Sequence, residues 1–328
     1  MENNDVLTDS VKKLYKSVSE GIGTMMVPKS LRPVIDSEAK LISNAEEVDI
    51  GWLLTEENQT GISIEETMEL CKRAGSRLLY QEVKKQKNME DVIAGAANIL
   101  EETPTVSKDP VDPDWMTRFF NSVQDVGNLE MQKLWSKLLA GEVRRPSSYS
   151  LRTLDILSKL SSEEAKLFAE ICKYIVEYRG TAALLNDEDI NKNYNLNYEK
   201  ILRLDECGLI DSNGIMSLTL KVAPGIPFKA IYGNYLIHGE SSKDQNINLP
   251  IYKLTMPGRE LYNIVSYDLD VNYLHEVEKK ICNQNYEISF SEHFIISKNN
   301  DGTFTYVRQG RSLSEHNTNQ ENSIASQE

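Results

Sequence analysis

The chain has 328 residues, enough for two or three domains, and its 40% hydrophobic and 26% charged residues are typical of a globular protein. A formal net charge of −14 excludes a surface that is basic throughout, although a small basic patch can still bind nucleic acid. The sequence has no run of about 18 apolar residues, and its acidic first ten residues lack a signal-peptide core. We therefore expect a cytoplasmic protein with no transmembrane segment.

Residues 1–57 are expected to form an N-terminal helical segment, with helices around Val11–Ser19 and Val34–Ala45. Between them, the apolar stretch Gly21–Pro28 is interrupted by glycines and ends in proline, which disfavours one continuous helix. Its flanking polar face is not strongly basic, so the pattern favours a connector packed on the protein over a peripheral contact with a membrane.

Residues 58–149 are expected to form a helical domain that begins with a long helix from Ser63 to about Glu101. Ser63 and Glu66 have the spacing of a capping box, in which each side chain satisfies a free backbone N–H at the helix start. The stretch is the most basic of the chain, but glutamates are interspersed with its lysines and arginines. This mixture favours a solvated helix with i,i+4 ion pairs over a nucleic-acid contact.

Two further helices are expected after residue 111. The first begins at Asp112, whose side chain can accept a hydrogen bond at the N-cap position and which precedes a proline at the first helical position. Gly127–Asn128 separates them, and the spacing predicts a tight helical hairpin that ends near Gly141 or Pro146. Its large aromatic residues recur at helical spacing, which is typical of core packing: Trp115, Phe119 and Trp135.

Residues 150–265 resemble a winged-helix domain, because three expected helices precede a small expected sheet. The helices begin at a capping box of Ser161 and Glu164, near Asp187 and at Asn197. The expected strands are Ile215–Val222, Ala230–His238 and Ile251–Thr255. Two landmarks carry the resemblance, a Gly-Leu-Ile that ends the third helix and a later Leu-Thr-x-x-Gly-x-x-Leu.

A DNA-binding version of this domain would place 195–203 in the major groove. The polar side chains available for contact there are Asn195, Asn197, Lys200 and Arg203. Because nearby acids leave the segment almost neutral, a structural or protein-binding role is favoured over DNA binding.

Residues 266–311 are expected to form a C-terminal extension, with a helix at Val271–Asn283 and a β-hairpin that turns at Asn299–Gly302. Residues 312–328 are polar and are expected to be a disordered tail. The expected fold class is therefore mainly α with a small β component: a helical region, a helical hairpin, a winged-helix-like module, and a C-terminal helix plus hairpin.

The sequence contains no recognisable catalytic pattern. Its four cysteines are far apart, its four histidines fall outside metal-binding spacings such as HExxH, and it has no phosphate-binding glycine loop or G-x-S-x-G element. We therefore expect no catalytic residue, no cofactor and no metal ligand. This favours a non-enzymatic protein, while an active site assembled from distant residues stays open.

The block between 110 and 265 resembles a bacterial family known as domain of unknown function 2806. The similarity is strongest at Trp135, Leu138, Leu139, Ala140, Gly141 and Glu142. A looser resemblance links the same helices to the abortive-infection alpha family. What the resemblance implies is a bacterial cytoplasmic protein of anti-phage defence, without any assigned catalytic residue.

The matching block contains five polar positions with two alternative interpretations. They line a functional groove in the first, and in the second they cap helices at the junction of two modules. They are Arg118, Gln132, Glu142, Arg152 and Thr153. The capping interpretation, with Arg152 bridging Glu142, is favoured because polar groups at a junction must find partners.

Three functions remain in competition. The leading hypothesis is an interaction or regulatory protein of anti-phage defence that binds a protein partner or forms a homo-oligomer. The first alternative is a DNA-binding transcriptional regulator, and the second is a metal-dependent nuclease whose carboxylates are scattered along the chain.

Overall fold

The computed structural model forms two compact units, Met1–Ser158 and Lys159–Glu328. It describes residues 7–22, 64–102, 105–212, 216–283, 287–298 and 304–308. Several expected features lie outside these residues: the Val34–Ala45 helix, most of Gly21–Pro28, Ser63, the Asn299–Gly302 turn and the 312–328 tail. None of the helices in the described part of the chain is both long enough and apolar enough to span a bilayer.

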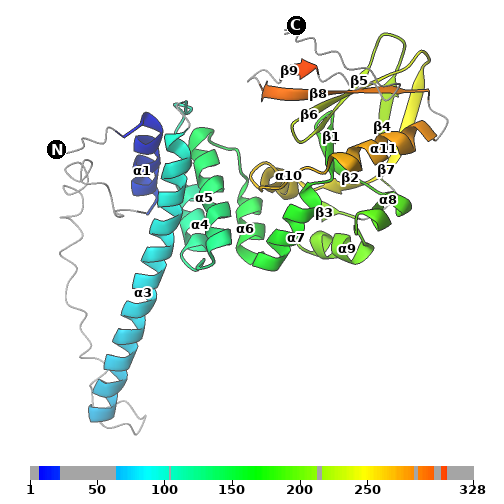
Figure 1. Ribbon diagram of the computed structural model, residues 1–328. Coiled ribbons are helices and arrows are strands. Elements are labelled where there is room, and N and C mark those ends of the chain that lie inside the picture. The colour runs from blue at the N-terminus through cyan, green and yellow to red at the C-terminus, as the bar shows by residue number, and fades with distance from the viewer. Residues whose placement is uncertain are drawn as a thin grey trace. The chain divides into compact units, whose positions relative to one another are not determined.

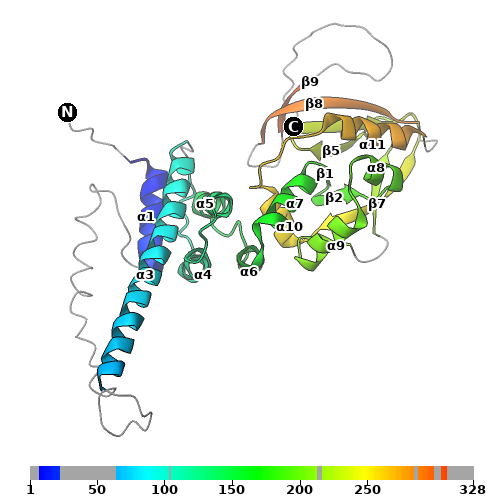
Figure 2. The ribbon, with the colours of Figure 1, turned by 60° about the horizontal axis from the view of Figure 1, so that its bottom comes forward.

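The first unit is helical in its described residues (Figure 1). Its helices are α1 (Asp9–Ile22), α3 (Ile64–Glu101), α4 (Pro113–Val123), α5 (Leu129–Arg144) and α6 (Leu151–Lys159). Both ribbon views show α1, α4 and α5 beside one half of α3, while the other half of α3 extends beyond them (Figures 1 and 2).

Local capping signals define where α4 and α5 begin. The Asp112 carboxylate accepts a hydrogen bond from the N–H of Asp114, and Pro113 occupies the first turn of α4. The Asn128 side chain accepts from two N–H groups at the start of α5. The two helices were expected to form a tight hairpin, but α4 packs chiefly against α1 and α5 chiefly against α3.

Aromatic side chains form the centre of the helical core. Phe119 stacks on Trp115 with ring centroids 5.2 Å apart and meets the edge of Trp135 at 5.3 Å. All three side chains are buried, and the Trp115 indole N–H donates to the carbonyl of Tyr149 at 2.9 Å. The structure thus confirms their predicted role as packing residues.

The contact between α3 and α5 depends on a glycine. A Cβ atom at Gly95 would overlap the Cβ and Oγ atoms of Ser136, so the two helices approach closely there. The Ser136 hydroxyl donates across the interface to the carbonyl of Val92 at 3.0 Å.

The second unit combines helices with a large sheet. Its helices are α7 (Ser162–Cys172), α8 (Glu188–Asn193), α9 (Tyr198–Glu206), α10 (Met256–Tyr262) and α11 (Val271–Asn283). Its strands are β1 (Ile175–Tyr178), β2 (Thr181–Leu185), β3 (Ile210–Asp211), β4 (Ser217–Val222), β5 (Phe228–Tyr232), β6 (Tyr235–Glu240), β7 (Gln245–Leu254), β8 (Ser289–Lys298) and β9 (Phe304–Arg308).

These nine strands form one antiparallel sheet in the order β3-β7-β2-β1-β5-β6-β8-β9, with β4 paired separately to β7. Strand β7 changes partners along its length. Its first part, Gln245–Pro250, pairs with β4, and its last part, Ile251–Leu254, pairs with β2 and β3.

The predicted fold class, mainly α with a small winged-helix sheet and a separate C-terminal hairpin, is therefore wrong. Two strands, β1 and β2, precede α8 where the sequence suggested a helix end and a polar loop. They were missed because each has only four or five residues, and their burial does not alternate. The C-terminal strands are not separate either, since residues 289–294 of β8 pair with β6.

Replacing Gly95 with alanine should destabilise the helical unit by up to about 2 kcal/mol. Overpacking against Ser136 costs about 1–3 kcal/mol, whereas the gain in helix propensity returns about 1 kcal/mol. Urea unfolding of Gly95→Ala measures the change, and the double variant Gly95→Ala/Ser136→Gly should show a favourable coupling energy between the two sites. A stabilised Gly95→Ala protein would contradict the close packing of α3 on α5.

Candidate interaction surface

The N-terminal half of α3 exposes an unusual number of large apolar side chains. They are Met68, Leu70, Leu78, Leu79, Tyr80 and Val83, each at least half exposed. By contrast, the C-terminal half of the same helix buries its apolar residues, among them Val92 and Leu100. One continuous helix therefore has a packed half and an exposed half.

Some of the exposed apolar residues share one side of the helix, while Leu70 and Tyr80 lie elsewhere around it. Met68, Leu79 and Val83 are separated by eleven and four residues, which places them within about 60° of one another on an α-helix, and Leu78 lies about 80° from Met68. We call these four residues the α3 stripe. Burying each such side chain against another surface would contribute about 1.5–3 kcal/mol.

Some of the charged residues around the α3 stripe pair within the helix. Arg73 lies 3.7 Å from Glu69 and Lys85 lies 2.9 Å from Glu82, as expected for a solvated helix. These pairs neutralise part of the local charge, whereas Lys72, Arg77 and Lys84 form no ion pair with the described residues. Lys72 lies on the same side of the helix as Met68, Leu79 and Val83, so the surface is apolar there apart from this one side chain.

The five polar positions of the matching block differ in burial and in their partners. Arg118 and Arg152 are exposed. Gln132 is buried and its amide donates to the carbonyl of Val126 at 2.9 Å. Thr153 is buried, and its hydroxyl lies 3.2 Å from that of Ser150 at the start of α6.

Glu142 is a structural residue. Its buried carboxylate accepts hydrogen bonds from the backbone N–H groups of Ser147, Ser148 and Tyr149 at 2.6, 3.0 and 3.0 Å. These bonds hold the turn after α5, in which Ser147 has a left-handed φ of 67°. The carboxylate thus binds backbone donors, not the side chain of Arg152 that the sequence suggested.

The four predicted DNA-contact residues lie in and before α9. The two that carry a charge, Lys200 and Arg203, are already paired with acidic residues. Asn195 has a left-handed φ of 55°, and the Asn197 side chain caps α9. Lys200 lies 3.0 Å from Glu170. Arg203 lies 3.6 Å from Glu163 and 3.7 Å from Glu164. Because acids of α7 neutralise both cations, the segment offers little attraction for phosphate.

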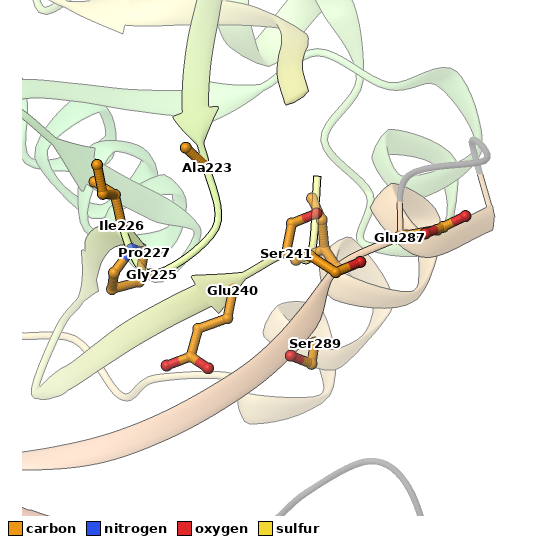
Figure 3. Close-up of a pocket in the computed structure, with 10 residues that line it drawn as sticks. Ala223, Gly225, Ile226, Pro227, Glu240, Ser241, Glu287 and Ser289 are labelled. Atoms are coloured by element: carbon orange, nitrogen blue, oxygen red, sulfur yellow. The ribbon is translucent and has the colours of Figure 1, made fainter. Parts of the chain in front are cut away.

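A polar hollow of about 650 Å³ opens between the turn after β4 and the ends of β6 and β8 (Figure 3). Its described lining includes Glu240, Glu287 and three serines, but no histidine, lysine or cysteine. The Glu287 carboxylate lies 2.7 Å from the ammonium group of Lys243. The described lining supplies serine hydroxyls and carboxylates but no imidazole or amine beside them, and Glu287 is already paired with Lys243, so we assign no catalysis to this hollow.

One group among the described residues could hold a metal ion: His275, Glu278 and Glu292. Burial, followed by the charge of Glu292, raises the pKa of Glu278 to about 8. The sequence does not reveal this group, because Glu292 belongs to a different element from His275 and Glu278. The remaining His-x-x-Glu spacing on α11 is weak evidence for a metal site by itself.

Removing the Glu142 carboxylate should lower the free energy of unfolding of the helical unit by about 3 kcal/mol. Three backbone donors lose a charged acceptor in Glu142→Ala, and buried donors without a partner are expensive. Chemical denaturation compares this variant with Glu130→Ala, which removes an exposed carboxylate from the same helix and should cost less than about 1 kcal/mol. Equal losses would contradict the structural role of Glu142.

Comparison with known proteins gives one match. A family model described as "Protein of unknown function (DUF2806)" matches residues 72–278, which include most of α3 and the sheet up to β7. No curated protein and no solved structure matches the chain. Because the match covers more than half of the sequence, the chain belongs to the DUF2806 family.

Proposed function

We propose that this protein is an interaction protein that associates with a second copy of itself through the α3 stripe. The observation that carries the proposal is the exposure of four apolar side chains along one side of a helix whose other half is firmly packed. Helices obtain most of their stability from packing an apolar face. The exposed half of α3 therefore needs a surface to cover it.

Two features favour a second copy of the chain as that surface. The four stripe residues are apolar and so self-complementary in chemistry, and the ion pairs of Arg73 and Lys85 reduce the charge that two copies would bring together. An isologous pairing would bury both stripes at once, which doubles the apolar area removed from water.

The setting that we propose is anti-phage defence. This part of the proposal rests on the resemblance of the helical block to the abortive-infection alpha family. A self-associating protein without an evident active site suits a sensor or regulator in such a system.

The two alternative functions have less support. DNA binding through α9 would have to break the pairing of Lys200 and Arg203 with acids of α7. A metal-dependent nuclease would have to bring a nucleic-acid phosphate to the one group among the described residues that could hold a metal, and two of its three members are buried. We therefore retain self-association as the proposal.

Replacing Leu79 with aspartate should convert a dimer into a monomer. Light scattering after size exclusion, at micromolar concentration, should give twice the chain mass of 37.2 kDa for the natural protein and the single chain mass for Leu79→Asp. The physical reason is that a charge in the middle of the stripe must be desolvated on pairing.

Leu129→Asp is the matched control, because Leu129 is 70% exposed and Leu79 is 67% exposed. It should keep the dimer mass. A monomeric natural protein would contradict the proposal. So would a Leu79→Asp variant that keeps the dimer mass, and if it also melts at lower temperature, another part of the chain covers the stripe.

Bacteria that express the natural protein should plate fewer phage than bacteria with an empty vector, and Leu79→Asp should lose this protection. The Leu129→Asp protein should retain it, since Leu129 belongs to α5 and is not one of the stripe residues. Efficiency of plating across a broad phage panel is the measurement. Equal plating with the natural protein and with the vector would remove the defence setting but leave self-association standing.

A further inference from the structure

Helix α11 and strand β8 bring together three side chains that can each act as a metal ligand. His275 and Glu278 are one turn apart on α11, and Glu292 lies on β8, which runs beside α11 in both ribbon views (Figures 1 and 2). The imidazole Nε2 of His275 lies 2.9 Å from a carboxylate oxygen of Glu292. One ligand atom from each of the three residues lies within 4.8 Å of the other two.

The carboxylate of Glu278 is the least expected of these groups. Its residue is 1% exposed, and neither oxygen has a hydrogen-bond partner among the described residues. A buried carboxylate without a donor is expensive, and Glu292, itself buried, adds a second acid nearby. A proton on Glu278 would remove one charge, but the resulting O–H would still need an acceptor.

A bound cation would satisfy both carboxylates at once. We propose that His275, Glu278 and Glu292 bind one divalent transition-metal cation, for which Zn²⁺ is the best representative, and that this cation fastens α11 to β8.

The ligand set selects the class of cation. An imidazole nitrogen favours Zn²⁺ and related transition metals, whereas Mg²⁺ prefers a site made wholly of oxygens. Three protein ligands and one water complete a tetrahedral zinc shell. Ligand atoms about 2.1 Å from such an ion are roughly 3.4 Å apart. Side-chain rotation must therefore close the separations that reach up to 4.8 Å by at most about 1.4 Å and open the 2.9 Å His275–Glu292 separation by about 0.5 Å.

Among the described residues, the group consists of these three side chains. His293 follows Glu292 on the strand and so faces the opposite side of the sheet, where its ring lies 4.6 Å from that of His238. Cys282 is on α11 but exposed, and its thiol lies 3.5 Å from the carbonyl of Ile288. The half-exposed ring of His275 gives the cation its path from solvent.

Titration of the metal-free full-length protein with ZnCl₂ tests the proposal. Calorimetry and elemental analysis should find one tightly bound Zn²⁺ per chain, with a higher melting temperature in its presence. Glu278→Gln and His275→Ala should each weaken binding at least about 100-fold, because each removes a direct ligand. Glu278→Gln should fold well, since it replaces a buried charge by a neutral group of the same shape.

Glu276→Gln, on the same helix, is the matched control and should bind Zn²⁺ as the natural protein does. The proposal is overturned if the natural protein binds no Zn²⁺ or if Glu278→Gln binds as tightly as Glu276→Gln. The second result would locate the ion at surface thiols such as Cys282. Tighter binding of Mg²⁺ than of Zn²⁺ would overturn the assigned class of cation.

Discussion

The antiparallel pairing of β7 with three other strands is the interaction on which the second unit depends. The first part of this ten-residue strand pairs with β4, and its last part holds β2 on one side and β3 on the other. Strand β2 in turn pairs with β1, and the sheet continues from β1 through β5 and β6 to β8. Residues as distant as Thr181 and Lys298 therefore share one hydrogen-bonded network, and the loss of β7 would separate β3 and β4 from it.

The helical unit depends on a different constraint, the close approach of α3 and α5 at Gly95. This contact fixes the packed half of α3, and the aromatic cluster around Phe119 fills the space beside it. Since the packed half is held, the exposed half keeps its direction without contacts of its own among the described residues. Core packing and the proposed association surface are thus properties of one helix.

Local features of the fold could be predicted from sequence, and long-range ones could not. Asp112 and Ser161 begin helices as predicted, and both hydrogen bonds of the Ser161–Glu164 capping box are present, because capping involves only neighbouring residues. The sheet was underestimated because strand pairing joins residues far apart in sequence, as between β2 and β7. The meeting of Glu278 with Glu292 likewise follows from tertiary structure. The bonds of Glu142 to Ser147, Ser148 and Tyr149 are local, but they depend on the conformation of the turn after α5, for which no sequence spacing rule is known.

The length of α3 has a mechanical consequence. Gly95 and Met68 are 27 residues apart, which corresponds to about 40 Å of helix. A tilt of about 5° where α3 crosses α5 would displace the far end by about 3.5 Å, given a rise of 1.5 Å per residue. The helix would then act as a lever, which converts a small repacking around Ser136 into a large movement of whatever is bound at its tip.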